Sequence, residues 1–192
     1  EGVLQNRGKD LFGVLNGMDV EEWNPETDGH IPRHFSTSRP SGKQVCKTAL
    51  RKECGLPEVD VPLLAMISRL DEQKGFDLLL EIMDELMEAD LQCVILGTGK
   101  PAYHQRLKDL ALRYPEKLSV HLAFDNALAH RIEAGADVFL MPSRYEPCGL
   151  NQLYSLKYGT LPVARKTGGL VDTIVDYSPS TIRSRLTNGF LF

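Results

Sequence analysis

The chain has 192 residues, 42% of them hydrophobic and 25% charged, which is the composition of a globular domain with its own core. Its net charge of −4 lacks the basic excess of nucleic-acid-binding proteins, so any anion site must be local. No apolar run approaches the ~18 residues of a membrane span, so we expect neither nucleic acid nor a membrane as a partner.

Apolar runs alternate with amphipathic stretches, which is typical of a parallel sheet with helices on both faces. We therefore predict a single α/β domain over residues 1–192, built on a doubly wound sheet. The predicted strands are residues 12–15, 63–67, 93–96, 118–122, 138–141 and 161–164, with residues 189–192 as a truncated strand. The predicted helices are residues 42–54 after an N-cap at Ser41, 76–87, 102–114 entered through Pro101, 126–134 behind Asp125, and 150–157.

Residues 23–41 are rich in Pro, Gly, His and Thr and show no helical or alternating periodicity, so we expect a surface loop there. Glu1 stands where an initiator Met would be, and residues 189–192 end inside an apolar run. We therefore expect the chain to be a fragment of a longer protein.

The chain has four cysteines, and none of them shows a Cys-x-x-Cys spacing. They are scattered over predicted helices, a strand and a loop, so we expect reduced thiols and a reducing compartment. The four are Cys46, Cys54, Cys93 and Cys148.

In a doubly wound sheet, ligands bind beyond the carboxyl ends of the strands. After strand 63–67, Arg69 and Lys74 place two cations on one turn, and Gly75 opens a helix. Fixed cations beside free helical N–H groups suit a diphosphate. The alternative is a solvated turn in which these cations pair with Asp71 and Glu72.

The turn after strand 138–141 contains Glu146 between Pro142 and Pro147. A carboxylate at this edge can accept hydrogen bonds from sugar hydroxyls and stabilise developing positive charge. The alternative is a carboxylate that caps the next helix.

The turn after strand 161–164 contains Arg165 and Lys166, followed by Thr167, Gly168 and Gly169. Two glycines at a helix start let a phosphate approach the backbone N–H groups closely. A plain glycine turn remains an alternative. Three anion-compatible turns at one sheet edge favour a phosphate site more than any single turn does.

Residues 97–102 fit the G-x-G-x-x-A form of the dinucleotide fingerprint through Gly97 and Gly99, which raises the alternative of a dehydrogenase. That fingerprint belongs in the first βαβ unit, whereas at least two strands precede it here. A tight turn near the nucleotide is the better interpretation. His130, alone on an amphipathic helix, is interpreted as a packed side chain.

Several short motifs of the chain occur together in one enzyme family. They are Leu15-Asn16-Gly17-Met18-Asp19, Ser68-Arg69-Leu70, Gln73-Lys74-Gly75, His130-Arg131-Ile132, Gly135-Ala136-Asp137, Pro142-Ser143-Arg144-Tyr145-Glu146-Pro147-Cys148-Gly149-Leu150, Gln152-Leu153-Tyr154, Lys157-Tyr158-Gly159-Thr160 and Thr167-Gly168-Gly169-Leu170. Through them the chain resembles bacterial glycogen synthases and plant starch synthases, which lengthen α-1,4-glucans with glucose from ADP-glucose. The resemblance extends from about residue 13 to residue 192.

The resemblance implies the C-terminal, Rossmann-like lobe of a two-domain GT-B glycosyltransferase that retains anomeric configuration. ADP-glucose would be a substrate, no metal or other cofactor would be needed, and the α-1,4-glucan acceptor would bind mostly to an N-terminal lobe absent from this chain. The isolated lobe would be inactive. The compartment would be the cytoplasm of a bacterium or a plastid, and the strength of the preference for ADP over UDP stays open.

By the family's pattern, Arg69 and Lys74 bind the diphosphate and Glu146 holds the glucosyl ring. Around these three candidate catalytic residues, the resemblance places the donor-binding residues Phe124, Cys148, Gly149, Leu150, Thr167, Gly168, Gly169 and Leu170. The tight turn near the nucleotide adds Gly97 and Gly99 to this set.

Two positions depart from related transferases. Tyr154 stands where many of them have a second Glu for the ribose, and Phe124 stands where bacterial members often have a Tyr expected to stack on adenine. The alternative function is a nucleotide-binding or regulatory module that kept the fold and lost the activity, and the presence of Arg69, Lys74 and Glu146 argues against it.

Overall fold

The computed structural model describes residues 2–192 and contains a six-stranded sheet in the order β3-β2-β1-β4-β5-β6. Every neighbouring pair of strands is parallel, which confirms the predicted doubly wound sheet. The strands are β1 (Leu63–Ile67), β2 (Gln92–Leu96), β3 (Leu118–His121), β4 (Val138–Met141), β5 (Leu161–Ala164) and β6 (Phe190–Leu191).

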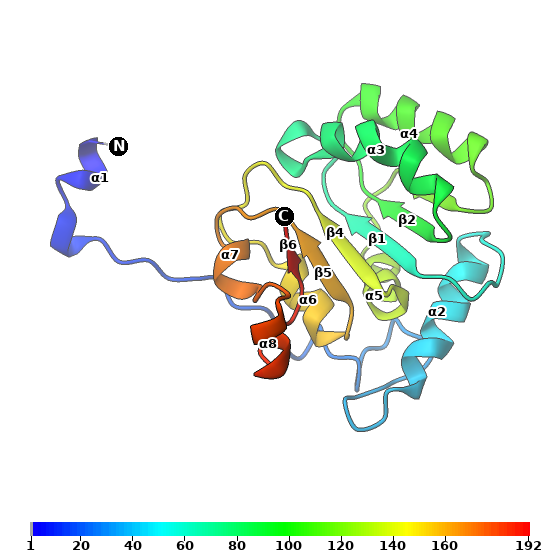
Figure 1. The fold of residues 1–192 in the computed structure, drawn as a ribbon, viewed down its shortest axis with the longest axis horizontal. Coiled ribbons are helices and arrows are strands. Elements are labelled where there is room, and N and C mark those ends of the chain that lie inside the picture. The colour runs from blue at the N-terminus through cyan, green and yellow to red at the C-terminus, as the bar shows by residue number, and fades with distance from the viewer. Residues whose placement is uncertain (1) are drawn as a thin grey trace.

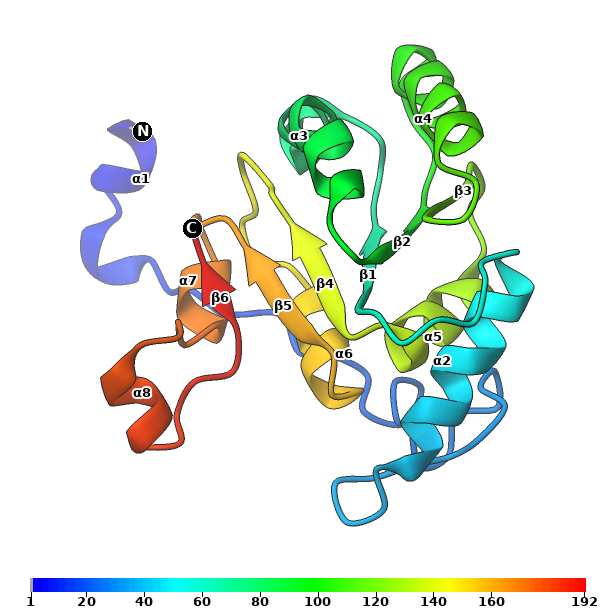
Figure 2. The same cartoon turned by 45° about the vertical axis from the view of Figure 1, so that its right-hand side comes forward.

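The main helices lie on both sides of the sheet (Figures 1 and 2). Two of them, α3 (Phe76–Glu88) and α4 (Pro101–Arg113), cover one face over β1–β3. The other face is covered by α2 (Ser41–Glu53), α5 (Asn126–Gly135) and α6 (Asn151–Lys157). Shorter elements are α1 (Gly2–Gln5), α7 (Leu170–Thr173), α8 (Pro179–Arg183) and two 3-10 turns, η1 (Gly8–Asp10) and η2 (Glu72–Lys74).

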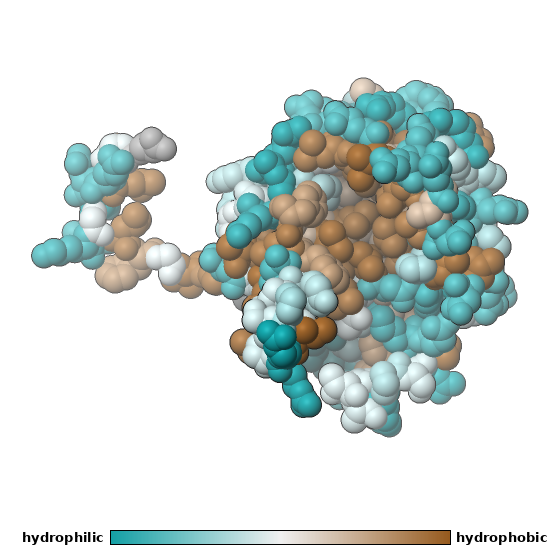
Figure 3. Space-filling view, viewed as in Figure 1, coloured by the Kyte–Doolittle hydropathy of each residue, from teal (hydrophilic) through white to brown (hydrophobic). Residues whose placement is uncertain are grey.

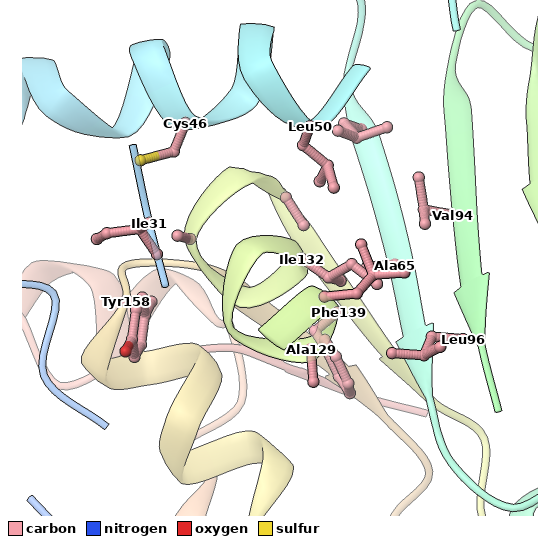
Figure 4. Close-up of a cluster of buried hydrophobic side chains, with 14 of the residues drawn as sticks. Ile31, Cys46, Leu50, Ala65, Val94, Leu96, Ala129, Ile132, Phe139 and Tyr158 are labelled. Carbon is pink, nitrogen blue, oxygen red and sulfur yellow. The ribbon is translucent and has the colours of Figure 1, made fainter. Parts of the chain in front are cut away.

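The alternation of side chains along β1 places apolar groups on both faces of the sheet. Leu63 and Ala65 pack in the core beneath α2 and α5, whereas Leu64 and Met66 pack in the core beneath α3 and α4. Figure 4 shows the first of these cores, where Ala65 lies among side chains from α2, α5 and β4. The central strands are therefore fixed from both sides, and their carboxyl ends are held in one line.

Two sequence predictions about the N-terminal part are wrong. Residues 12–15 form no strand; they extend away from the sheet (Figure 1), with Phe12 84% and Val14 91% exposed. An apolar run of this length forms a strand only when it has a partner to pair with, and no described strand lies beside it. Ser41 is the first residue of α2 and not its N-cap, a position that Pro40 occupies without a side-chain cap.

The segment 23–41 is irregular, as predicted, but it is not merely a surface loop. Trp23, Ile31 and Phe35 are buried in the core. The Trp23 ring lies between two parallel rings, those of His130 at 3.8 Å and Tyr154 at 3.9 Å between centroids. Sequence periodicity missed this packing because the partners lie on α5 and α6, more than a hundred residues further along the chain.

His130 is a buried, packed side chain, as predicted. Its Nδ1 lies 2.9 Å from Oδ2 of Asp28, which also accepts a 2.6 Å hydrogen bond from the Tyr158 hydroxyl. All four cysteines are free thiols, in agreement with the sequence analysis.

An apolar hollow of about 510 Å³ opens where β4 and β5 extend past α3. Ile82, Leu140, Val163 and Phe192 line it, and Figure 3 shows apolar surface in this part of the view. Within residues 2–192 no helix covers this hollow. A contiguous apolar surface of this kind is typical of an interface.

A buried polar cluster joins α2, α5 and α6 beneath the sheet. The Ser155 hydroxyl donates to Oε2 of Glu133 at 2.8 Å, and Lys43 donates to the Thr160 hydroxyl at 2.8 Å. Burial raises the pKa of Glu133 to about 8 and lowers the pKa of Lys43 to about 8. The fold therefore holds a carboxyl group whose ionisation works against folding.

The free energy of unfolding of the wild-type chain should fall as the pH rises from about 4.5 to 8. We predict that this fall is absent in Glu133→Gln. The pKa of Glu133 is about 8 in the folded chain against 4.5 for the free side chain. The folded state thus keeps a proton that the unfolded state releases, so the free energy of unfolding falls as the pH rises through this window. Glutamine has no such proton and can still accept from Ser155. Urea unfolding at about pH 5, 6.5 and 8 measures the effect. Parallel pH profiles for both proteins would contradict it.

Candidate functional site

The loops that follow the parallel strands gather at one edge of the sheet. The loop after β1 packs against the loop after β2, because the Leu70 N–H donates to the Thr98 carbonyl at 3.0 Å and the Lys100 N–H donates to the Leu70 carbonyl at 3.0 Å. The loop after β4 joins the loop after β1, because Arg144 N–H donates to the Gln73 carbonyl at 2.9 Å. Turns that are distant in the sequence thus form one continuous surface.

Lys74 is fixed by the turn in which it lies. The Asp71 carboxylate caps η2 by accepting from the Lys74 N–H at 3.0 Å, and Gly75 ends the turn in the left-handed region with φ 76°. A side chain at position 75 would overlap the Pro142 carbonyl, so glycine also allows the β1 and β4 loops to meet. The Lys74 ammonium is thereby directed toward the loop after β4.

Glu146 forms an ion pair with the Lys74 ammonium. Lys74 Nζ lies 2.6 Å from Oε2 of Glu146, and the two side chains are only 21% and 8% exposed. The Ser143 hydroxyl donates to the same oxygen at 3.0 Å. The carboxylate makes no hydrogen bond to the start of α6, whose N-cap, Leu150, has no side-chain cap. The alternative interpretation of Glu146 as a helix cap is therefore wrong.

Arg69 lies on the same loop but in solvent. Its guanidinium is 3.2 Å from Asp71 and 3.3 Å from the Gln73 amide oxygen, and its side chain is 67% exposed. The alternative of a solvated turn thus describes Arg69, but it does not describe Lys74. An exposed ion pair of this kind is weak, so Arg69 can exchange Asp71 for a ligand at little cost.

Two adjoining hollows open at this edge. One, of about 190 Å³, is lined by Lys74, Ser143 and Glu146 together with apolar side chains of β1 and β4, and it is named the polar hollow for its ion pair. The other, of about 250 Å³, is lined mostly by apolar groups together with Arg69 and Phe124. It is the apolar hollow of the site and is distinct from the 510 Å³ hollow beside α3. Ile67, Ser68 and Asn151 line both, so the hollows share a wall. A polar compartment beside an apolar one fits a ligand with a charged end and a flat, apolar end.

A larger hollow lies elsewhere on the molecule. It measures about 720 Å³ and is lined by Arg33, Arg39 and Gly42 among others. The neighbouring Lys43 bonds to Thr160, which directly precedes β5, so this hollow lies at the amino end of the strands. Its arginines are exposed, and no buried charge faces it. We therefore place the site by its chemistry and not by volume.

The turn after β5 packs on the backbone of Glu146. Gly169 N–H donates to the Glu146 carbonyl at 3.0 Å, and Gly168 has φ 47° with no space for a side chain beside that carbonyl. Within the described residues, no hydrogen bond uses the N–H of Thr167 or Gly168. The Leu170 side chain is fully buried in the core. The free N–H groups of Thr167 and Gly168 are therefore available to a ligand.

The other predicted donor-binding residues also lie at the carboxyl edge of the sheet. Gly97 and Gly99 pack against residues 68–70, where side chains would overlap the backbone, so close approach accounts for both glycines. Phe124 is 91% exposed and lines the apolar hollow. Cys148 and Gly149 have their carbonyls bonded by the Gln152 amide at 3.0 and 3.1 Å. Leu150 lines the polar hollow.

Three further residues, which the sequence pattern did not single out, shape the site. Ser143 holds Glu146, Gln152 ties down the turn at Cys148, and Asn151 donates to the Ile67 carbonyl at 2.7 Å. Ser143 and Gln152 belong to the motifs quoted above, and Asn151 lies between them. Their place in or between these motifs was the signal, but their roles depend on side-chain directions that the sequence does not give.

Asp, Glu, His and Cys side chains form no metal-ligating group among residues 2–192. No described helix is long and apolar enough to cross a membrane.

Comparison with known proteins gives consistent matches. The family described as "Glycosyl transferases group 1" matches residues 49–192. The glycogen synthase of Anaeromyxobacter sp. (strain Fw109-5) is 55% identical over 178 residues, covering 92% of this chain and 38% of that protein. The glycogen synthase of Fervidobacterium nodosum is 53% identical over 192 residues, covering 100% of this chain and 39% of that protein.

A solved structure is similar over the whole chain. The catalytic domain of starch synthase IV from Arabidopsis thaliana, bound to ADP and acarbose, superposes with a TM-score of 0.93 at 37% identity. The match covers 100% of this chain and 40% of that one. The chain thus spans about two-fifths of the length of these proteins.

We predict that Gly168→Ala destabilises the chain and displaces Glu146. Alanine at φ 47° is strained, and its methyl group would overlap the Glu146 carbonyl. The cost should be ~2 kcal/mol or more in the free energy of unfolding. Gly55→Ala is the matched control, because Gly55 has φ 69° but open space around it. A Gly168→Ala variant no less stable than Gly55→Ala would show that contact with the β4 loop costs nothing.

Proposed function

The chain belongs to the glycosyl transferases group 1 family, and from this premise we propose that it is the donor-binding lobe of a glycogen or starch synthase. The enzyme would transfer glucose from ADP-glucose to the non-reducing end of an α-1,4-glucan with retention of configuration. The observation that carries the proposal is the Lys74–Glu146 pair, 2.6 Å apart, at the carboxyl edge of the sheet. The names of the relatives and the ADP-bound starch synthase structure support this substrate class.

The proposed chemistry separates charge at the bond that breaks. Negative charge grows on the leaving diphosphate, and Lys74 and Arg69 are the cations on the β1 loop that would stabilise it. The free N–H groups of Thr167 and Gly168 would donate to the distal phosphate. These fixed donors would take the role that a metal ion has in other nucleotide-sugar enzymes, so we propose a reaction without a metal or other cofactor.

Positive charge grows at the anomeric carbon, and Glu146 is the carboxylate placed to face it. Its Oε2 is held by Lys74 and Ser143, and the backbone at Cys148, Gly149 and Leu150 lies next to it in the chain. The adenosine would occupy the apolar hollow with its base against Phe124, as aromatic stacking requires little more than an exposed ring. An exposed aromatic ring can stack on adenine or on uracil, so the apolar hollow alone does not select ADP over UDP.

The glucan acceptor would bind mainly to an N-terminal lobe, and closure of the two lobes would exclude water from the donor. We propose the bacterial cytoplasm over a plastid as the compartment, because the two curated relatives described above are bacterial.

Two other functions remain to be distinguished by experiment. A regulatory nucleotide-binding module would have no need for the cation and carboxylate paired in the polar hollow. A dehydrogenase would bind NAD at Gly97 and Gly99, but those glycines are accounted for by their contact with residues 68–70.

We predict that the isolated chain binds ADP weakly, does not bind NAD, and transfers no glucose. Its two cores give it a fold of its own, but catalysis needs the second lobe. Calorimetric titration with ADP, ADP-glucose and NAD measures binding, and release of ADP in the presence of a maltooligosaccharide measures transfer. Tighter binding of NAD than of ADP would favour the dehydrogenase. Failure of the full-length protein to transfer glucose from ADP-glucose would contradict the proposed enzyme.

A further inference from the structure

Both groups that hold Glu146 contact the same carboxylate oxygen. Lys74 Nζ and the Ser143 hydroxyl lie 2.6 Å and 3.0 Å from Oε2. Oε1 has no hydrogen-bond partner among the described residues, and it is not one of the buried atoms that lack a partner. Oε1 thus keeps accessible surface on a residue that lines the polar hollow, whereas Oε2 is held by Lys74 and Ser143.

The anchor from Ser143 is built into the end of β4. Ser143 comes two residues after the last residue of that strand and is only 2% exposed. An ionised carboxylate can only accept, so the serine hydroxyl is the donor in this bond. Hydrogen bonds to a charged acceptor are stronger than those between neutral groups. The bond ties Glu146 to the rigid sheet three residues upstream in the chain.

The anchor from Lys74 cannot remain unchanged if Lys74 also neutralises a diphosphate. In the free chain its charge is already balanced by Glu146. An arriving diphosphate competes for the ammonium, and any shift of Lys74 weakens its hold on Oε2. Ser143 is then the side chain that keeps the carboxylate in place, because its neutral hydroxyl is attracted to a diphosphate much less than the Lys74 ammonium is.

We propose that Ser143 is a positioning residue, which keeps Glu146 Oε1 directed at the donor sugar when Lys74 turns from Glu146 to the diphosphate. The inference rests on the proposed function and deepens it. Lys74 and Ser143 thus have different roles. Lys74 neutralises the leaving diphosphate, and Ser143 orients the Glu146 carboxylate that faces the sugar.

The test compares two serines that make the same kind of bond. Ser143 donates to Glu146 in the site, and Ser155, equally buried, donates to Glu133 in the core at 2.8 Å. Ser143→Ala, Ser143→Thr and Ser155→Ala are made in the full-length protein. For each variant, kcat and KM for ADP-glucose, the Kd for ADP and the melting temperature are measured.

We expect Ser143→Ala to lower kcat by about tenfold to a hundredfold, while the Kd for ADP changes by less than about twofold. Ser143→Thr, which keeps the hydroxyl, should restore most of kcat. Ser155→Ala should lower the melting temperature and leave kcat unchanged.

A Ser143→Ala variant with kcat within about twofold of the wild type would overturn the inference. So would a loss of kcat that is matched by equal losses of ADP affinity and melting temperature, because that pattern indicates a structural role. So would a threonine variant that melts normally but is as slow as the alanine variant. A wild-type protein without glucosyl transfer would instead overturn the proposed function, which keeps the two failures distinct.

Discussion

Lys74 and Glu146 are 72 residues apart in the sequence, and their contact depends on the pairing of β1 with β4. The strand order turns at this pair, because β1, β2 and β3 run to one side while β4, β5 and β6 run to the other. The loops after β1 and β4 consequently leave the sheet toward opposite faces and open a crevice between them. The hollow lined by Lys74 and Glu146 lies at this switch point, and the second hollow adjoins it along the loops after β1, β2 and β3. Placing a carboxylate and an ammonium together there is costly unless both are hydrogen-bonded, and Ser143 supplies part of that compensation.

The same constraint explains which loops need glycine. Gly75 and Gly168 lie where neighbouring loops touch backbone to backbone, so that Pro142 and Glu146 are each fixed by a turn from an adjacent strand. The site is therefore not a set of separate turns. A change in any one loop is transmitted to Glu146 through contacts that leave no space for a side chain.

Much of the sheet could be predicted from the sequence, because buried parallel strands are continuous apolar runs, and the runs at 63–67, 138–141 and 161–164 match β1, β4 and β5. The run at 12–15 has the same local pattern, but nothing pairs with it. The prediction of a surface loop at residues 23–41 missed the buried side chains there. Trp23 stacks between His130 and Tyr154, and the periodicity of the local sequence cannot reveal partners so distant in the chain. At the site, the sequence indicated the edge and its charged residues. It could not show that Lys74 pairs with Glu146 and not with Glu72, or that Ser143 bonds the same oxygen, because these depend on side-chain directions across two strands.

We propose that Glu146 acts on the donor sugar and does not merely hold Lys74 in place. Glu146→Gln in the full-length protein tests it most directly, since glutamine keeps the size and the hydrogen bond from Ser143 but removes the charge. We expect turnover with ADP-glucose to fall by about a hundredfold or more, while the ADP affinity is kept or raised, because Lys74 no longer has a carboxylate to pair with. Turnover near the wild-type value, together with a lowered melting temperature, would contradict the account and leave Glu146 a structural partner of Lys74.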